Sequence, residues 1–420
     1  MKATQALAGW ALIGALAMGT GTARATEVQV SSDSTYRLNT PVAGFAADGS
    51  SVIVWTDEQR GLTARLFDAN GQPTGGAFTL VANDMLTGIP AHGNVVIRKD
   101  PALVVEPGGD FWAFWTEEKA WMSVNAFLEN KIVRDRDVRG QHFDASGQAL
   151  GARFQVNVLA RGWQSRPQAI ATPSGLVVAW EATNLDPVSV VGDGIFARRL
   201  DASGAPLSGD LRISLGAQAA LPHDVALAAD DTGAFVVAYD SPGIGAGREV
   251  WARRFDAQGH PSGVAALVNQ TFRWNQSRPA IASGDGGFVV AWQGQIDAQH
   301  WKVFTRQLDA NGAASGDQAA VSPGQAKWEV APSLCARPSG GYLLSWIDWD
   351  GTFPIAIRAL PLDAGGAVAG DRITVNDFQP GAQFRTFLVA GPNAKALATW
   401  EGFFDNHDDL GISARWLDLN

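Results

Sequence analysis

One structural unit recurs along nearly the whole chain, and this recurrence limits the possible folds more than any other feature of the sequence. The clearest copy, residues 279–312, contains three short apolar segments and closes with an Asp-Ala-Asn-Gly turn. Each copy has an apolar run that ends in an aromatic residue, followed further along by an apolar residue and Asp. The chain is therefore an array of one structural unit rather than a set of unrelated domains.

Two markers define the copies and alternate along the chain. The aromatic markers are Trp55, Trp115, Trp180, Tyr239, Trp292, Trp346 and Trp400, and the turn markers are Asp68, Asp144, Asp201, Asp256, Asp309, Asp363 and Asp418. From Tyr239 to Trp400 the aromatic marker recurs at nearly equal intervals. Plentiful Val, Ala, Trp and Phe, with scarce Lys and Glu, favour strands over helices. A period of this length in an all-strand sequence predicts the blades of a β-propeller.

Each copy offers four strands, which we name A to D. In the clearest copy, strand A covers residues 280–283, strand B 288–292 and strand C 303–309, and strand D is best seen at 154–157 and 373–376. The continuous apolar character of strand B predicts a sheet that neighbouring blades cover on both faces.

The two ends of the chain complement each other. The last copy stops after strand C, while residues 27–31 resemble a strand D and precede the first strand A. We therefore expect Glu27–Ser31 to pair with Ile412–Leu417 and to close a ring, since closure removes exposed sheet edges. The sequence predicts an all-β fold, a seven-bladed β-propeller formed as one domain by residues 26–420. Its last blade would combine one N-terminal strand with three C-terminal strands.

The N-terminal segment, residues 1–25, predicts export. Lys2, an apolar stretch over residues 6–18 and the motif Ala23-Arg24-Ala25 form the pattern of a secretory signal peptide cleaved after Ala25. No later run approaches membrane-spanning length, so we expect a secreted or periplasmic monomer without a membrane span. Lys2 and Arg24 are the only charged residues of this segment, so its removal takes the net charge from −10 to −12. This acidity argues against nucleic acid as a partner.

The loops fall into two kinds. The A–B and C–D turns are short and nearly uniform, and a meandering blade places both on one face of the disc. The B–C and D–A loops lie on the other face and vary in length. The stretch from the aromatic marker to the turn Asp is equally long in three copies, but it is longer after Trp115 and after Trp180. Because function concentrates on the variable loops of a rigid scaffold, we expect the site on this variable face.

Residues present in nearly every copy are predicted to serve the scaffold. The turn Asp residues suit capped turns in which a following Gly takes a positive φ, and single acids at this spacing supply too few oxygens for calcium. The strand B aromatics are assigned to the core. Arginines three positions before the turn Asp are predicted to pair between blades, and they are Arg65, Arg198, Arg253, Arg306 and Arg415.

Carboxylates follow strand B in six of the seven copies, where the inner strands should surround the mouth of a central channel. Asp57, Glu117 and Asp348 are candidates for ligand binding, and Glu181, Asp240 and Glu401 are candidates for acid and base catalysis. An acidic funnel would suit a cation, an amine or sugar hydroxyls. The alternative is that these acids cap backbone groups at solvated strand ends.

Three arginines align just before strand A, at Arg166, Arg278 and Arg385. Around a channel they could bind a carboxylate or a sulfate in a bidentate manner. The alternative, which the sequence favours, is that they pair with the neighbouring strand B carboxylates, because unpaired acids clustered there would repel one another.

Tryptophans crowd the same loops. The less repetitive Trp121, Trp301 and Trp349 are candidate ligand-binding residues, since Trp beside carboxylates suits sugars. The six histidines show no metal-ligand spacing, and no nucleotide-binding or hydrolase motif occurs, so we expect no metal and no cofactor. The only cysteine, Cys335, lies in an apolar run and is predicted to be a buried thiol.

The units GGFVVAW…VFTRQLDANG and LVVAW…IFARRLDASGAPLSGDLRIS resemble a repeat found in large secreted bacterial proteins. The resemblance covers nearly the whole mature chain and implies an exported, propeller-like protein of a group mostly without assigned activity. The GGxGxDxxx calcium repeats that often lie near such units do not occur here, so no calcium-dependent role is implied. The SxDxGxTW boxes of sialidases are also missing from the sequence.

Three functions stay open at this point. The first is a binding module that recognises a carbohydrate or a cell-surface protein partner through the variable face. The second is a glycan hydrolase or lyase, in which mouth carboxylates act as acid and base while the arginines hold an acidic sugar. The third is a structural subunit of an envelope assembly that docks through the loop 117–139. The sequence does not decide between binding and catalysis.

Overall fold

The computed structural model of the protein describes residues 27–31, 37–86, 94–124, 130–158, 162–183, 193–214, 222–243, 247–284, 287–322, 326–352, 355–377, 382–403 and 410–419. Within these residues it contains 29 strands and no helix, so the fold is all-β. The described residues accordingly include no helix that could cross a membrane. The predicted signal peptide, residues 1–25, lies outside the described residues.

The strands follow one another along the chain as antiparallel meanders. The first meander consists of β2 (Leu38–Phe45), β3 (Ser51–Asp57), β4 (Gly61–Phe67) and β5 (Phe78–Ala82). The second consists of β7 (Asn94–Val105), β8 (Phe111–Val124), β9 (Asn130–Phe143) and β10 (Phe154–Gln155), and the short β6 (Asp84–Leu86) pairs with β7. The third consists of β11 (Trp163–Thr172), β12 (Gly175–Thr183), β13 (Gly194–Leu200) and β14 (Leu211–Arg212).

The second half of the chain repeats this order. The fourth meander consists of β15 (His223–Ala229), β16 (Phe235–Pro242), β17 (Arg248–Phe255) and β18 (Ala266–Leu267). The fifth consists of β19 (Gln276–Gly284), β20 (Gly287–Gln295), β21 (Trp301–Leu308) and β22 (Ala314–Ala320), and the sixth of β23 (Trp328–Ala336), β24 (Tyr342–Trp349), β25 (Ala356–Leu362) and β26 (Ile373–Thr374). The last group contains β27 (Gln383–Ala390), β28 (Lys395–Phe403), β29 (Leu410–Asp418) and, from the other end of the chain, β1 (Val28–Gln29).

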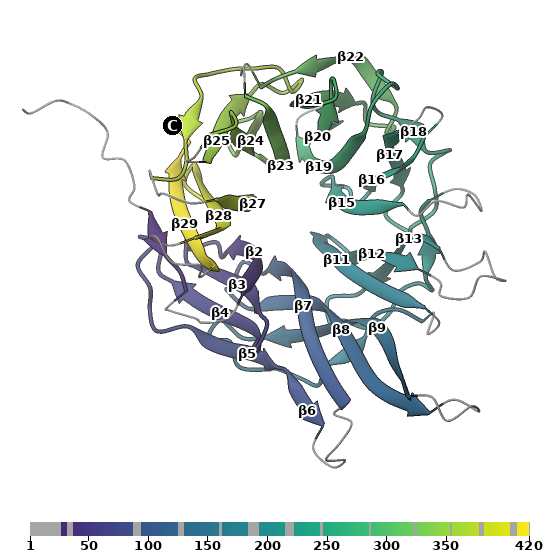
Figure 1. The fold of residues 1–420 in the computed structure, drawn as a ribbon, viewed down its shortest axis with the longest axis vertical. Coiled ribbons are helices and arrows are strands. Elements are labelled where there is room, and N and C mark those ends of the chain that lie inside the picture. The colour runs from purple at the N-terminus through teal and green to yellow at the C-terminus, as the bar shows by residue number, and fades with distance from the viewer. Residues whose placement is uncertain are drawn as a thin grey trace, which may run out of the picture.

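Hydrogen bonds join these groups into five sheets rather than into one sheet for each group. A single parallel bridge between Trp163 and Arg136 connects the third meander to the second, and one between Trp301 and Trp328 connects the fifth to the sixth. Because each bridge is a single residue pair, the meanders stay distinct units. Their first strands lie innermost around a central axis, which is the radial arrangement of a β-propeller (Figure 1).

The second strand of each group is buried because neighbouring groups cover both of its faces. All seven residues of β3 are buried, and Trp180 and Trp292 have no exposed surface. One core cluster joins Trp112 and Phe114 of β8 to Trp180 of β12, across the boundary between two meanders. The core is thus a series of interfaces between adjacent groups, as the continuous apolar character of strand B predicts.

The third strands carry the arginines that were predicted to pair between blades, and the structure confirms this pairing. Each guanidinium donates a hydrogen bond to the carbonyl that directly follows the fourth strand of the preceding group. Arg198 Nη1 lies 2.6 Å from Val156 O, and Arg306 Nη1 lies 2.7 Å from Val268 O. The same contact joins Arg65 to Val30, Arg253 to Ile213 and Arg415 to Val375.

The turns between third and fourth strands confirm the predicted capping by Asp. Asp201 Oδ1 accepts the N–H groups of Ser203 and Ala205, each at 2.8 Å, and Gly204 between them has a φ of 83°. The same pair of bonds occurs at Asp68, Asp144, Asp256, Asp309 and Asp363. These acids are therefore committed to the backbone of their own turns.

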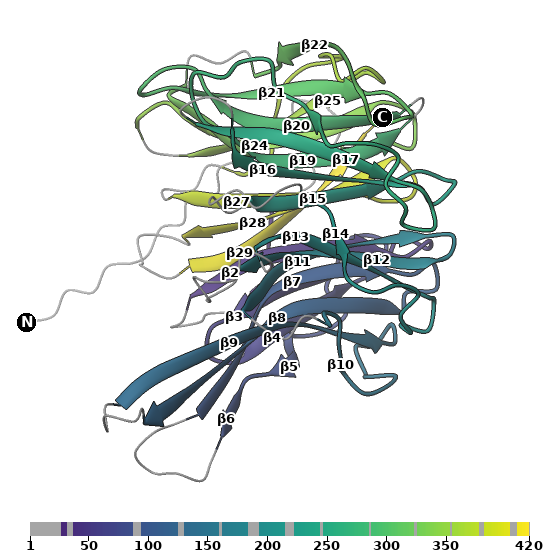
Figure 2. The ribbon, with the colours of Figure 1, turned by 90° about the vertical axis from the view of Figure 1, so that its right-hand side faces the viewer.

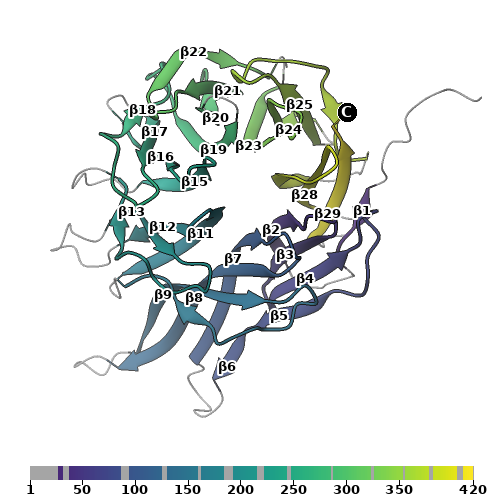
Figure 3. The ribbon, with the colours of Figure 1, turned by 180° about the vertical axis from the view of Figure 1, so that it is seen from behind.

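The N-terminal segment pairs with the last strand, as the sequence predicts. The two residues of β1 face Ala414 and Ser413 of β29 in antiparallel register, and Figure 3 shows β1 beside β29. Val30, which follows β1, is fully buried in a cluster with Ile412 and Trp416. One strand from the N-terminus and three from the C-terminus thus share a sheet.

The second meander extends beyond the others. Its strands β7, β8 and β9 are 12, 14 and 14 residues long and project from the ring (Figure 2). At the base of this projection Arg136 pairs with Glu118 at 2.9 Å, and its guanidinium lies 4.2 Å from the ring centroid of Trp163 in β11. This contact ties the projection to the third meander. The side chains of residues 121–133, within the predicted docking loop, lie outside the described part of the chain.

We predict that Val30→Asp lowers the free energy of unfolding by about 3 kcal/mol or more, because it places an unpaired carboxylate in the buried cluster beside β29. Urea denaturation followed by tryptophan fluorescence measures the change. Gln29→Asp is the matched control, since Gln29 is exposed and should shift the value by less than about 0.5 kcal/mol. Equal stability of the two variants would show that the N-terminal segment does not pack against the last strand.

Candidate binding site at the channel mouth

Each inner strand contains a bulge near its start. One residue at each bulge takes a left-handed backbone, with φ between 41° and 54°. These bulge residues are Thr40, Asp100, Arg166, Asp224, Arg278, Ala331 and Arg385. Five of the seven are followed by proline, which has no N–H to leave unpaired where the ladder is interrupted. The three arginines aligned in the sequence therefore occupy equivalent positions in the structure.

A side chain from the preceding group accepts the backbone N–H of nearly every bulge residue. Glu181 Oε1 accepts from Asp224 N at 2.8 Å, and Gln293 Oε1 accepts from Ala331 N at 2.9 Å. The same bond joins Thr40 to Glu401, Asp100 to Thr56, Arg166 to Thr116 and Arg278 to Asp240. These acceptors, which we call the cap residues, directly follow the aromatic marker. Each bond joins two neighbouring groups and offsets the cost of a left-handed backbone.

The cap position corrects the sequence interpretation of the mouth carboxylates. Acids occupy this position in three of the seven groups, at Glu181, Asp240 and Glu401. The other groups have Thr56, Thr116, Gln293 and Ile347 there. Because side chains alternate along a strand, Asp57 and Glu117, one residue further on, point to the other face. The channel mouth is therefore not ringed by six carboxylates, and the alternative of backbone capping describes the three acids at the cap position.

Asp57, Glu117 and Asp348 are bound within their own groups. Asp57 Oδ1 accepts the N–H groups of the next turn at 2.9 Å. Glu117 lies 3.3 Å from the guanidinium groups of both Arg98 and Arg139, and Asp348 accepts a hydrogen bond from its neighbouring strand at 3.0 Å. None of the three lines the central cavity described below.

Two of the tryptophan candidates, Trp301 and Trp349, do not line that cavity either. Trp301 is half-buried, and Trp349 packs against Trp328 with ring centroids 4.5 Å apart. The side chain of Trp121 lies outside the described residues. Cys335 is buried, as predicted, and burial raises the pKa of its thiol to about 12, so the thiol stays protonated.

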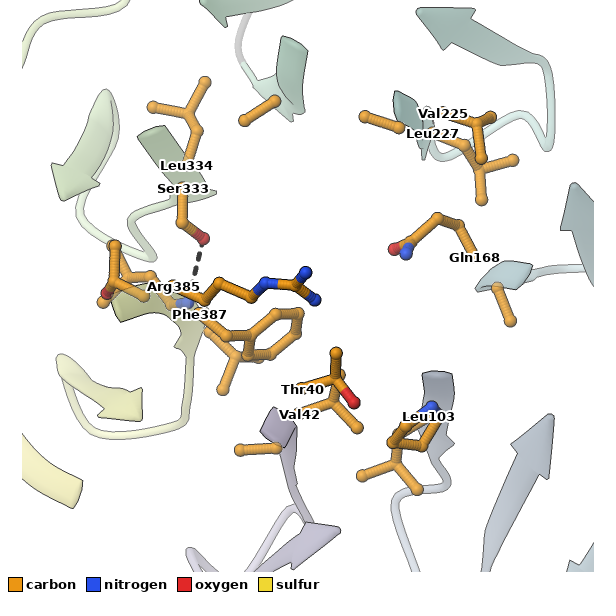
Figure 4. A pocket seen from close by; sticks show the side chains of 18 of the residues that line it. Thr40, Val42, Leu103, Gln168, Val225, Leu227, Ser333, Leu334, Arg385 and Phe387 are labelled. Atoms are coloured by element: carbon orange, nitrogen blue, oxygen red, sulfur yellow. Dashed lines mark hydrogen bonds between the residues drawn. The ribbon is translucent and has the colours of Figure 1, made fainter. Parts of the chain in front are cut away.

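A cavity of about 670 Å³ opens between the inner strands, with the bulge residues on its lining. Its volume is in the range of small-molecule sites. Figure 4 shows Arg385 and Gln168 extending toward each other from β27 and β11, with the apolar side chain of Phe387 beside Arg385. Among the sequence candidates, Arg166, Arg278, Arg385 and Glu181 line this cavity. Asp240 and Glu401, which cap the backbone N–H groups of Arg278 and Thr40, do not line it.

One sector of the mouth is acidic. Arg166 Nη1 lies 3.6 Å from Glu181 Oε1 and 3.7 Å from Asp224 Oδ1. Burial lowers the pKa of Arg166, but the negative charges of Glu181, Asp224 and Asp100 outweigh it and raise the pKa. The charge of this arginine is thus balanced by acids, as the pairing alternative predicts.

The opposite sector is poor in acids. Arg278 is exposed, and no carboxylate among the described residues lies within ion-pair distance of its guanidinium. Arg385 Nε lies 3.9 Å from Glu401 Oε1, and 52% of its side chain is exposed. Between them in ring order stands Ala331, which has no charge. The pairing alternative therefore does not describe Arg278, and this sector offers guanidinium groups to the cavity.

Asp240 is buried, and each of its two carboxylate oxygens accepts a hydrogen bond. Arg248 Nε donates to Oδ1, and the backbone N–H of Arg278 donates to Oδ2 at 3.1 Å. Burial, and then the charge of Asp224, raise the pKa of Asp240 to about 7 against these stabilising contacts. Burial also raises the pKa of Glu401. Asp240 thus titrates near neutral pH while serving as a cap.

Sequence reasoning missed three residues of the mouth: Asp100, His223 and Asp224. Asp100 and Asp224 occupy bulge positions. His223 Nδ1 lies 3.4 Å from Glu181 Oε2. Asp100 could have been found, because it precedes a proline just as Arg166 and Arg278 do. Asp224 precedes Val225 instead and carries no such signal.

Comparisons with known proteins identify a fold but not a family. No protein-family model matches the chain, and no curated protein matches its sequence. A solved structure of a protein of unknown function from Dyadobacter fermentans DSM 18053 has a TM-score of 0.55 at 12% identity, covering 94% of this chain and 99% of that one. At this identity the likeness shows a shared fold alone.

Two further solved structures have lower scores. The α-L-arabinanase of Penicillium chrysogenum complexed with arabinobiose has a TM-score of 0.49 at 13% identity, covering 95% of this chain and 99% of that one. An α-L-arabinofuranosidase from Fusarium graminearum has a TM-score of 0.48 at 12% identity, covering 94% and 98%. These scores establish no function for the present chain.

Asp240→Asn is predicted to change how stability depends on pH. The carboxyl ionises near 3.8 in the unfolded chain and near 7 in the folded protein, so the folded protein holds an extra proton between these values. The parent should therefore lose stability relative to the variant as pH rises from about 4 to about 7, by about 2–4 kcal/mol. Urea denaturation at a series of pH values measures this difference.

Asp231→Asn provides the control for this comparison, because Asp231 is exposed on the turn of the same meander. Its pH profile should follow that of the parent. A difference between the parent and Asp240→Asn that stays constant over the whole range would contradict the raised pKa of Asp240.

Proposed function

We propose that the protein is an exported glycan-binding propeller that takes an acidic sugar at the channel mouth, with the sugar carboxylate on Arg278 and Arg385. The observation that carries this proposal is the guanidinium of Arg278, which lines the cavity without a carboxylate partner among the described residues. Guanidinium groups bind carboxylates in a bidentate manner, and two of them facing one cavity favour an anionic ligand.

The rest of the cavity suits a sugar better than a simple anion. Asp100 and Asp224, in the acidic sector, can accept hydrogen bonds from hydroxyl groups. Apolar side chains, among them Leu103, Leu227 and Phe387, supply walls for the C–H faces of a ring. A uronic acid combines one carboxylate with several hydroxyls, and it therefore matches both sectors. A neutral sugar would leave the guanidinium groups without a counter-charge.

The architecture we infer for this function is a seven-bladed ring. The seven groups of strands would be the blades, and β1 would close the ring by completing the sheet of β27, β28 and β29. Residues 26–420 would form this single domain, secreted or periplasmic after cleavage at Ala25, and monomeric. The seven bulges and the arginine contacts between successive groups support this count.

A binding measurement with trigalacturonate tests the proposal. Isothermal titration calorimetry should detect binding of this uronate trimer to the parent and weaker or no binding of neutral galactotriose. Arg278→Ala should weaken trigalacturonate binding by about 10- to 100-fold, because a hydrogen bond to a charged group contributes about 1.5–3 kcal/mol. Higher salt should weaken it further in the parent.

Arg60→Ala is the matched control for this measurement. Its side chain is 56% exposed, close to the exposure of Arg385, but it does not line the cavity. Its affinity should equal that of the parent. Parent-like affinity in Arg278→Ala, or equal affinity for the neutral trimer, would refute the proposal.

Cleavage of the same glycan is a second candidate function, favoured by the pair Glu181 and Asp224. Glu181 Oε1 and Asp224 Oδ1 lie 3.6 Å and 3.7 Å from the same atom, Arg166 Nη1. The distance between these two carboxylate oxygens therefore cannot exceed the sum of the two values. Paired carboxylates of glycosidases lie about 5–9.5 Å apart. Asp224 is the more accessible of the two, with 34% of its side chain exposed.

Incubation with trigalacturonate separates binding from cleavage. A hydrolase releases reducing ends, and a lyase releases an unsaturated sugar. If the parent cleaves, Asp224→Asn should lower the rate by about 100-fold or more, whereas Asp231→Asn should leave it unchanged. Binding without any release of products would assign the protein to binding alone.

A further inference from the structure

Three potential metal ligands meet at the other end of the second meander, away from the D–A loops. Glu106 and Asp110 flank the turn between β7 and β8, and His142 lies near the end of β9. One ligand atom from each of the three lies within 4.8 Å of the others. The sequence gives no sign of this cluster, because the histidine lies far along the chain from the two acids.

Each of the three side chains is held in place by a further contact. The His142 ring stacks on Trp112, with centroids 4.2 Å apart and an angle of 4° between the planes. Trp112 Nε1 donates to Glu106 Oε1 at 2.9 Å, and Asp110 Oδ1 accepts the N–H of Ala145 at 3.0 Å. Contacts of this kind orient the ligands of metal sites before the ion arrives.

The Nε2 atom of His142 is buried and makes no hydrogen bond to any described residue. It lies 3.3 Å from Glu106 Oε1, within ion-pair distance, but not in the geometry of a hydrogen bond. Buried polar atoms are rarely left without a partner. A ligand between His142 and the two acids would satisfy this nitrogen.

The fourth meander offers a comparison within the same chain. The position of Glu106 is taken there by Asp230 and that of His142 by Arg254, and these two side chains pair at 3.3 Å. Ala234 stands where Asp110 does. The fourth meander thus fills this place with a permanent cation and one acid. The second meander has an imidazole nitrogen and two acids in its place.

We propose that Glu106, Asp110 and His142 bind a divalent transition-metal ion of the zinc type. An imidazole nitrogen with two carboxylates is a donor set that Zn²⁺ accepts, and water would complete the coordination. The ion would fasten the turn between β7 and β8 to β9 and, through Ala145, to the following turn. Its role is structural, and it is independent of the proposed glycan site.

Calorimetric titration of the mature chain, purified without a histidine tag, with ZnCl₂ tests this site. The number of Zn²⁺ ions bound per chain should be one higher in the parent than in His142→Ala or Asp110→Asn. If a variant still binds the ion, its dissociation constant should be at least tenfold higher than that of the parent. Asp110→Asn keeps an oxygen for the Ala145 N–H, so it should fold even if His142→Ala does not. Zn²⁺ should raise the melting temperature of the parent and not that of the variants.

His260→Ala controls for adventitious binding, because His260 is exposed and pairs with a single acid, Asp256, at 3.0 Å. It should keep the site that the other two variants lose. Failure of the parent to bind Zn²⁺, or equal stoichiometry and affinity in the parent, His142→Ala and Asp110→Asn, would overturn the proposal. A preference for Ca²⁺ over Zn²⁺ would contradict the metal class.

Discussion

The hydrogen bond from the backbone of a left-handed bulge residue to the cap residue of the preceding group, made at six of the seven bulges, is the constraint on which the channel mouth depends. A left-handed backbone costs a non-glycine residue roughly 1–3 kcal/mol, and the inner strands adopt it at seven equivalent places. Three of the acceptors are buried carboxylates, Glu181, Asp240 and Glu401, and a hydrogen bond to an ionised carboxylate is stronger than one to a neutral group, which helps to offset that cost. The same bond fixes the direction in which the bulge side chain leaves the strand.

This constraint explains how a scaffold of repeats presents a site that does not repeat. The cap bonds use only backbone N–H groups, so the bulge side chains are free to differ from one group to the next. Arg166 stands among Glu181, Asp224 and Asp100, whereas Arg278 has no acid beside its guanidinium among the described residues. The resulting contrast between an acidic sector and a cationic sector is what favours a ligand with both hydroxyls and a carboxylate.

Much of the scaffold could be predicted because it repeats. The turn acids, the arginines of the third strands and the pairing of residues 27–31 with the last strand all followed from comparing copies of one unit. Which residue faces the bulge at the channel mouth could not be predicted from the sequence. Thr56 and Asp57 are adjacent, and only the strand pairing shows that Thr56 is the one that accepts the hydrogen bond of the bulge. The cluster of Glu106, Asp110 and His142 was equally invisible, since its members meet only across a meander.

A crystal structure of the protein grown with trigalacturonate would show directly whether an acidic sugar binds at the channel mouth. We expect the sugar to lie in the cavity between the inner strands, with a carboxylate in bidentate contact with the Arg278 guanidinium and hydroxyls toward Asp100 or Asp224. A sugar bound on the outer loops, with the Arg278 guanidinium still facing solvent, would contradict it.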